Sequence, residues 1–383
     1  MKTRAAVLHG IGERWQIEEI EVDPPGPGEV LVKTAYAGLC HSDEHLVTGD
    51  LVPPQELLDA LGVDSIFPMI GGHEGSGVVV EVGPNVTKVA PGDHVSCAFV
   101  PACGICPPCA AGKQNLCDLG ARTFGGGMIT DGTFRHHRGD GTDLNTLAKL
   151  GTFSEHMLLA DASVIKVEPD LPLDAVCLVS CGVATGYGSA VNRAEVRAGD
   201  TVVVVGCGGI GSNAVQGAAA AGAANIIAVD PVQFKQEKAM EFGATHAVGS
   251  MEEALPLVNE LTWGRMAAAT ILTPGVLYGD LIQQAMNLTT KGGTVVATAV
   301  APMSQEDVKL DLAGLTLNQK ELRGTIFGSA SPNAAIPELL MLYRQGKLKL
   351  DELITRRYSL DEINEGYQDM NDGKNIRGIL AFD

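Results

Sequence analysis

Basic side chains are scarce in this chain. Its 383 residues include 27 Lys and Arg against 46 Asp and Glu, which gives a formal charge of −19 at pH 7. Nucleic acids and anionic membrane surfaces are bound through basic faces. The charge balance therefore argues against nucleic-acid and membrane partners, and it is what a well-hydrated surface requires.

Long apolar runs are also missing. No stretch approaches the roughly 18 apolar residues that cross a bilayer, and residues 1–15 lack the apolar core of a secretory signal. The nine cysteines are therefore expected to stay reduced and available to metal. These absences predict a cytoplasmic protein.

The apolar pattern changes along the chain, which is long enough for two domains. Residues 1 to about 150 contain short strand-like segments bounded by Gly, Pro and Asp, at 30–33, 77–82 and 94–99. From about residue 182, apolar strands alternate with helical stretches, and this alternation predicts a doubly wound parallel sheet. Its predicted strands are 201–205, 226–229, 269–272 and 294–299. Beyond residue 327 the pattern ends, and we expect helices at 336–343 and 360–370 and a closing segment at 375–382.

Four cysteines lie in one short segment, Cys103, Cys106, Cys109 and Cys117. Gaps of two residues let a tight turn aim successive sulfurs at one point, which suits a tetrahedral Zn²⁺. Four thiolates fill the coordination sphere, so this segment predicts a structural zinc rather than a reactive one.

A glycine-rich motif follows the predicted strand 201–205 and opens a predicted helix at 208–221. It contains Gly206, Gly208, Gly209, Ile210 and Gly211, and Asp230 lies 19 residues after Gly211, at the end of the next strand. In this setting the motif predicts a dinucleotide site, because its glycines let the backbone approach a pyrophosphate at a helix N-terminus. Asp230 would bind the adenosine ribose hydroxyls and repel a 2′-phosphate, which favours NAD over NADP.

A second metal set is dispersed along the chain. Cys40, His73 and Cys181 provide two thiolates and one imidazole, a set that leaves one position of a zinc ion open. Taken singly, each residue has an ordinary structural role, since a buried Cys is usually a small core residue. Their separation along the chain does not show whether they meet.

The segment from Gly72-His73-Glu74 through Gly77, Gly83 and Val86 resembles the signature of zinc-containing medium-chain alcohol dehydrogenases. The resemblance covers nearly the whole chain, and residues 40–50 and 186–190 are especially similar to the actinobacterial nitrosoaniline-dependent branch. It implies an α/β protein with a GroES-like catalytic domain at 1–181 and 327–383 and a Rossmann NAD(H)-binding domain at 182–326.

The resemblance also implies roles for single residues. Cys40, His73 and Cys181 fall on catalytic zinc positions, and the four clustered cysteines fall on structural ones. Asp43 matches the residue that orients the ligating His, and Glu74 matches a carboxylate beside the metal. Ser42 and His45 match the inner and outer groups of a proton relay. The cofactor contacts are implied at His41, Thr185, Lys235 and Arg377, together with the glycine-rich motif and Asp230, and the substrate pocket at Phe99.

The implied enzyme binds two zinc ions and NAD(H) and interconverts primary alcohols and aldehydes by hydride transfer, as a homodimer or homotetramer. Three alternatives stay open: a nicotinoprotein that keeps NAD(H) and uses an external electron acceptor, a glutathione-linked formaldehyde dehydrogenase, and a non-catalytic NAD- and zinc-binding sensor. Residues 55–66 form an insertion, either a surface loop or a lid. The remaining thiols, Cys97, Cys177 and Cys207, are expected to be packing residues.

Overall fold

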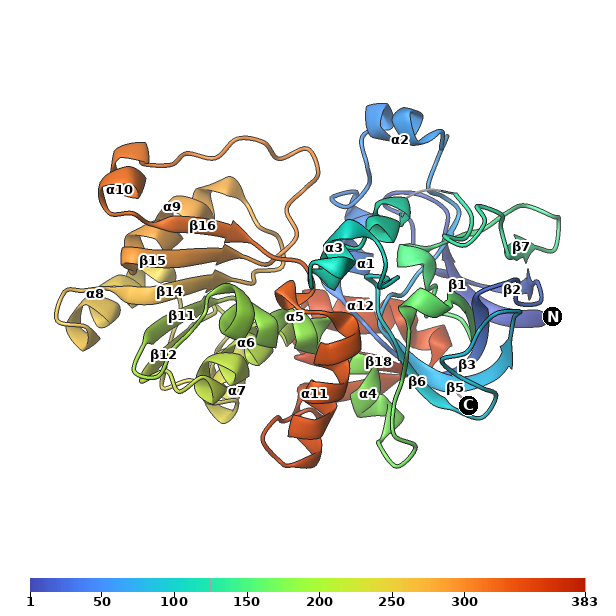
Figure 1. The fold of residues 1–383 in the computed structure, drawn as a ribbon. Helices are drawn as coiled ribbons and strands as arrows, with labels where there is room; N and C mark the ends of the chain where they lie inside the picture. Colours follow the sequence, from blue (N-terminus) through green and yellow to red (C-terminus); the bar gives the residue numbers. More distant parts are fainter. Residues whose placement is uncertain (124–125, 383) are drawn as a thin grey trace. The chain divides into compact units, whose positions relative to one another are not determined.

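The computed structural model describes residues 1–123 and 126–382. Two compact units divide these residues. The first contains residues 1–181, 331–344 and 350–382, and the second contains residues 182–330 and 345–349. Figure 1 shows the course of the chain, coloured from the N-terminus to the C-terminus. Within the described residues no single helix is long and apolar enough to cross a membrane, and one bent pair, Leu173–Val179 with Gly182–Arg193, meets that test only when the two helices are joined.

The first unit is built on two sheets. One has the strand order β7-β2-β1-β4-β8, and the other has the order β10-β6-β5-β3-β18-β17, with β9 also paired to β3. The bounds of these strands are β1 Lys2–Leu8, β2 Gln16–Val22, β3 Glu29–Gly38, β4 Met69–Ile70, β5 Gly75–Val82, β6 His94–Cys97, β7 His136–Arg138, β8 Asn145–Thr146, β9 His156–Ala160, β10 Val164–Lys166, β17 Ile354–Tyr358 and β18 Arg377–Ala381. The C-terminal strand β18 thus pairs with the early strand β3 inside one sheet.

Six helices accompany these sheets: α1 His41–Thr48, α2 Gln55–Leu61, α3 Pro107–Ala110, α4 Leu173–Val179, α11 Pro332–Arg344 and α12 Ile363–Asn371. An aromatic cluster joins α12 to the sheets, because the ring of Tyr367 stacks on Trp15 at 6.2 Å and meets Phe153 at 6.3 Å. Leu46 of α1 and Leu58 of α2 belong to the same buried cluster. This core therefore supports α1, the helix that begins directly after Cys40.

The second unit is a parallel sheet with the order β13-β12-β11-β14-β15-β16. Its strands are β11 Thr201–Val205, β12 Asn225–Val229, β13 His246–Val248, β14 Ala267–Leu272, β15 Thr289–Ala297 and β16 Glu321–Gly324. Its helices are α5 Gly182–Gly188, α6 Gly209–Ala220, α7 Gln233–Glu241, α8 Met251–Leu261, α9 Gly279–Leu288 and α10 Leu312–Leu317. Figure 1 shows α6 and α7 on one side of the sheet and α9 on the other, so the predicted doubly wound arrangement is confirmed.

Local predictions differ from the structure in several places. The strand predicted at 94–99 ends at Cys97, and the helix predicted at 360–370 begins with a 3₁₀ turn, Leu360–Glu362, before α12. That turn is closed by a capping box between Ser359 and Glu362. The insertion at 55–66 is not a plain loop, because α2 forms there and Leu58, which is 4% exposed, anchors it in the core. Its role as a lid stays a prediction.

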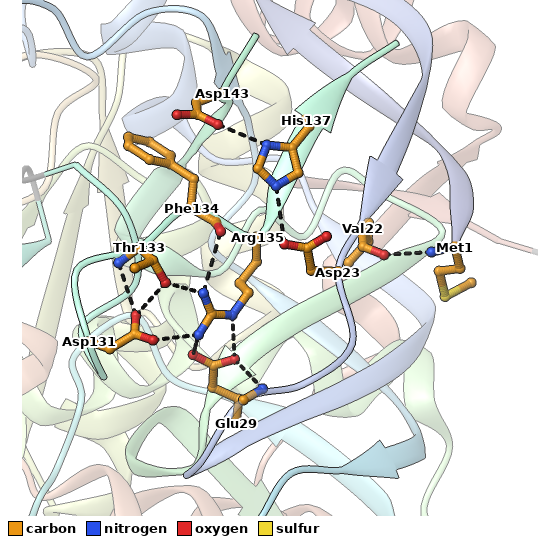
Figure 2. A network of polar contacts seen from close by, with 11 residues as sticks. Met1, Val22, Asp23, Glu29, Asp131, Thr133, Phe134, Arg135, His137 and Asp143 are labelled. Carbon is orange, nitrogen blue, oxygen red and sulfur yellow. Dashed lines mark hydrogen bonds and ion pairs between the residues drawn. The ribbon is translucent and has the colours of Figure 1, made fainter. Parts of the chain in front are cut away.

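A buried ion pair fastens the segment after residue 126 to β3. Figure 2 shows Arg135 over Glu29, with Nε 3.0 Å from Oε2 and a terminal nitrogen 3.2 Å from Oε1. Glu29 also accepts hydrogen bonds from Thr130 and from the amide of Gly26. The side chain of Glu29 is fully buried and that of Arg135 is 12% exposed. The two opposite charges therefore neutralise each other in a site with little access to water.

The adjacent His136 predicts a pH dependence of stability. Burial, assisted by the neighbouring His137 and Arg135, lowers the pKa of His136 to about 4 from 6.5. Between pH 6.5 and pH 4, His136 is protonated in the unfolded chain but stays neutral in the folded chain. The free energy of unfolding should therefore decrease as the pH falls through this range, by about 3 kcal/mol in total. Thermal unfolding measured across this range should show a shallower pH slope for His136→Gln, whereas equal slopes in both proteins would contradict the assignment.

Candidate functional site

The four clustered cysteines meet at one point. Their sulfurs all lie within 4.8 Å of one another, and the Cys103–Cys109 and Cys106–Cys117 pairs are 4.0 and 3.8 Å apart. Sulfurs at 2.3 Å from one tetrahedral zinc ion would be about 3.8 Å apart, so the set fits zinc. Backbone amides support the sulfurs as well, since the N–H groups of Cys106 and Asp118 donate to Cys103 and Cys106.

The dispersed residues Cys40, His73 and Cys181 are also brought together. Cys40 lies between β3 and α1, His73 lies between β4 and β5, and Cys181 follows α4. Their ligand atoms, with a carboxylate oxygen of Glu74, lie within 4.8 Å of one another, and all four residues are buried. The buried Nε2 of His73 has no hydrogen-bond partner. An orphaned imidazole nitrogen beside two thiols fits a zinc ion with three ligands and one open position.

The backbone around His73 is set by close packing. Gly72 has φ +88°, and a Cβ there would lie 2.6 Å from the amide nitrogen of Phe153. Asp43 holds both Gly72 and His73 in place. One of its carboxylate oxygens accepts a hydrogen bond from the Gly72 amide at 2.7 Å, and the other lies 3.1 Å from Nδ1 of His73. Such a carboxylate fixes the imidazole tautomer and leaves Nε2 for a metal.

The electrostatics favour a thiolate at this site. The pKa of Cys40 lies well below its usual value, because Cys181 hydrogen-bonds to it and the positive charges of His73 and Arg377 are close. For His73, burial lowers the pKa, but the anionic Asp43 and Cys40 outweigh burial and raise it. These opposite shifts are the response of protein groups to a buried cluster of charge that a metal cation would balance.

Glu74 and Arg377 form a buried pair beside these ligands. A terminal nitrogen of Arg377 donates to Glu74 Oε2 and, at 3.1 Å, to the carbonyl of Leu39. Burial raises the pKa of Glu74 to about 7, against the opposing effect of Arg377. The pair needs a glycine at the end of β3, because a Cβ on Gly38 would lie 2.1 Å from Glu74 Oε2.

The residues predicted as a proton relay lie on α1. Ser42 Oγ is 3.7 Å from the sulfur of Cys40. His45 is only 2% exposed, and its Nδ1 lies 3.3 Å from the carboxylate of Asp50, which is 23% exposed. Asp50 therefore lies between the buried imidazole and solvent. Phe99 meets His73 edge-to-face, with ring centroids 5.8 Å apart, and so contributes an apolar wall beside the metal ligands.

The glycine-rich turn in the second unit has the backbone that a dinucleotide requires. Gly206 has φ +87°, and a Cβ on Gly211 would lie 1.8 Å from the carbonyl oxygen of Gly206. Gly208 faces open space, and it precedes α6, whose N-terminus has no side-chain cap. The free amides of this helix start fit the pyrophosphate of NAD(H).

Asp230 stabilises that turn directly. Its two carboxylate oxygens accept the amides of Cys207 at 2.8 Å and Val232 at 2.9 Å, which leaves further lone pairs for ribose hydroxyls. Thr185 on α5 is buried with its hydroxyl unpartnered, an orphaned polar atom that fits a cofactor contact. Lys235 lies on α7. The contacts of Lys235, His41 and Arg377 with the cofactor stay predictions.

Comparison with known proteins decides the family. The family model of the alcohol dehydrogenase GroES-like domain matches residues 26–169, and that of zinc-binding dehydrogenases matches residues 209–344. Over 380 residues the chain is 56% identical to the NDMA-dependent alcohol dehydrogenase of Amycolatopsis methanolica, with 99% of each chain covered. The chain belongs to the zinc-binding alcohol dehydrogenase family. The present chain is also 36% identical over 388 residues to the S-(hydroxymethyl)glutathione dehydrogenase of Paracoccus denitrificans, with 100% of each chain covered.

Solved structures agree with this assignment. The benzyl alcohol dehydrogenase of Acinetobacter calcoaceticus matches with a TM-score of 0.88 at 29% identity, covering 100% of both chains. The predicted family and the predicted GroES-like plus Rossmann fold class are confirmed. Zinc and NAD(H) are the cofactors of this alcohol dehydrogenase, and its two sets of Cys and His groups are suited to the metal.

Some residues of the alcohol dehydrogenase site were not anticipated from the sequence. Gly38 and Asp50 contribute through the contacts above; Asp50 lies in the segment 40–50 that carries the resemblance, but nothing there marked it as the partner of His45. The spare thiols Cys97, Cys177 and Cys207 are fully buried. Burial raises the pKa of Cys97 and of Cys207 to about 12, which makes them unreactive packing groups at neutral pH.

Proposed function

We propose that this alcohol dehydrogenase interconverts primary alcohols and aldehydes at the site formed by Cys40, His73 and Cys181. The observation that carries the proposal is the buried cluster of ligand atoms with an unpartnered imidazole nitrogen. A non-catalytic sensor would not need the neighbouring Ser42 and the buried pair of His45 and Asp50.

Zinc would supply a Lewis acid that lowers the pKa of an alcohol oxygen, and NAD⁺ would supply the hydride acceptor. The chain's own residues do the remaining work. Asp43 holds His73 in the tautomer that directs Nε2 at the metal. Ser42 would accept the alcohol proton at Oγ while releasing its own hydroxyl proton outward, and His45, oriented through Nδ1 by Asp50, would be the outer group of this relay. Phe99 keeps water from the ligands.

A second proposal concerns the fate of the cofactor. We infer that NAD(H) stays bound through turnover and that a separate acceptor takes the electrons. The support is the 56% identity to a protein named NDMA-dependent, against 36% to the glutathione-linked relative. Gel-filtered protein should be denatured and its supernatant assayed for NAD(H) and zinc.

Stoichiometric NAD(H) after gel filtration, with alcohol oxidation driven by a nitrosoaniline acceptor and no added NAD, would support retention. Cofactor-free protein that turns over only with added NAD would leave an ordinary, freely exchanging dehydrogenase. Activity confined to formaldehyde plus glutathione would instead assign the glutathione-linked reaction. A protein that contains zinc but oxidises no alcohol under either condition would refute the primary proposal.

We also infer a homo-oligomer formed through the second unit. β16 is the last strand in its sheet, and the adjoining α10 leaves Leu312 67% and Leu317 85% exposed, with Leu322 of β16 at 42%. An open strand edge flanked by apolar side chains is a surface for pairing with a second copy. Light scattering after gel filtration should give a dimer or tetramer that Leu317→Asp weakens, and a monomeric wild-type protein would refute this.

A further inference from the structure

The turn before β18 is held by a chain of buried hydrogen bonds outside the proposed relay. Tyr358 Oη donates to Asp369 Oδ2 at 2.9 Å and accepts from Asn375 Nδ2 at 2.7 Å. These three side chains are 2%, 5% and 6% exposed. Arg356 and Lys374 form ion pairs with the same carboxylate, and these two cations favour the ionised form of Asp369. The result is a fully satisfied polar network, the kind that fixes one conformation.

A β-bulge gives the turn a second point of attachment. Ile354 is opposite Arg377 and Arg356 is opposite Gly378, so Thr355 is the extra residue of β17. Its hydroxyl lies 3.1 Å from the carbonyl of Arg377 and accepts the amide of Ile376 at 3.2 Å. Bulges re-aim side chains next to active sites, and this one directs a hydroxyl at the turn that precedes β18.

Arg377 and Gly378, which follow the turn, hydrogen-bond to the residue that precedes Cys40. Arg377 donates to the carbonyl of Leu39 at 3.1 Å, and the carbonyl of Gly378 accepts the amide of Leu39 at 3.0 Å. Leu39 is therefore held at both of its backbone polar groups, and it directly precedes Cys40. The same Arg377 nitrogen contacts Glu74 beside the ligand atoms.

We propose that Tyr358, Asn375 and Thr355 are positioning residues for the zinc bound by Cys40. They fix the turn so that Arg377 and Gly378 hold Leu39, and through it Cys40, in ligand geometry. The inference rests on the proposed function in one respect, that Cys40 binds a zinc ion. Groups outside the ligand set typically change metal affinity 10–100-fold when removed. Loosening the turn should therefore speed the loss of this zinc and leave the four-cysteine zinc unaffected.

The test is the rate of zinc release from the purified holoenzyme into the chromophoric chelator 4-(2-pyridylazo)resorcinol. Cys40→Ala identifies which phase belongs to this zinc, because that phase should be absent from the variant. Tyr358→Phe is expected to speed the identified phase by about tenfold and to leave the other phase unchanged. Tyr343→Phe is the matched control, since Tyr343 also donates to a carboxylate in the same unit, Asp351 at 2.8 Å, away from this turn.

Thr355→Val keeps the side-chain shape and provides an independent variant if Tyr358→Phe fails to fold. Selective acceleration in either variant supports the inference. A lowered melting temperature with both release phases unchanged, or equal acceleration of both phases, would overturn it and leave the network a purely structural role. A wild-type protein with fewer than two zinc ions, or a Cys40→Ala variant that retains both, would instead refute the proposed metal site.

Discussion

Cys40→Ala is expected to yield a folded protein that contains one zinc ion instead of two and has lost alcohol oxidation. Cys40 is one of the clustered ligand groups, and its sulfur cannot be replaced by a neighbour that already belongs to the set. A metal Lewis acid contributes several kcal/mol to catalysis, so kcat/KM should fall by about 10³-fold or more. Metal analysis by mass spectrometry and steady-state kinetics on the same preparation provide the measurement.

Cys97→Ala is the matched control for this result. Cys97 is also a buried cysteine of the first unit, 1% exposed, and its sulfur lies 3.3 Å from the carbonyl of Gly75. Both substitutions remove one buried sulfur, so their effects on packing should be similar. The control should keep both zinc ions and its activity. A fully active Cys40→Ala protein would end the proposed zinc mechanism, and equal losses in the two variants would indicate a packing effect.

Glu29→Ala is expected to lower the free energy of unfolding by about 3 kcal/mol. Removing one partner of a buried ion pair leaves the other charge uncompensated and typically costs about 3–5 kcal/mol. The lower end applies here because Arg135 keeps Asp131, whose side chain is 44% exposed, as a second partner. The amide of Gly26 and the hydroxyl of Thr130 also lose their acceptor. The shift should appear in thermal and urea unfolding.

The double variant Glu29→Leu with Arg135→Met is the informative control for this pair. Replacing both charges by apolar side chains of similar volume removes the uncompensated charge, so much of the lost stability should return. A double variant as unstable as Glu29→Ala would show that the lost hydrogen bonds to Gly26 and Thr130 dominate. Zinc content should be unchanged in both proteins, because none of these side chains belongs to either cluster of ligand atoms.

Local features of this site were predictable from the sequence, and distant ones were not. The four clustered cysteines lie within one short segment, residues 103–117, and the glycine-rich turn lies within one strand–turn–helix unit, so the spacing of each already implies its geometry. Cys40 and Cys181 are far apart in the chain, and they meet because β3 pairs with β5 and α4 packs against both strands. The resemblance to a family, not the spacing, identified them as one set.

The residues that were missed have no chemical signature of their own. Asp50 acts through a contact with His45, and Tyr358 acts through a turn formed seventeen residues later. Thr355 is directed at that turn only because β17 contains a bulge, which strand periodicity does not reveal. Boundaries differed for a similar reason, since the capping box of Ser359 and Glu362 favours a 3₁₀ turn where helical periodicity had predicted the start of α12.

Gly38 carries a consequence for the mutational tolerance of the chain. It has no side chain and supplies no ligand atom, yet the position that a Cβ would take there is already occupied by the carboxylate of Glu74 and the guanidinium of Arg377. Even alanine at position 38 would place its methyl carbon 2.1 Å from Glu74 Oε2 and 2.8 Å from a terminal nitrogen of Arg377. In a saturation library, position 38 should therefore behave as though it were part of the metal centre. Activity in such a library would then require glycine at position 38, because any side chain there would displace Glu74 or Arg377.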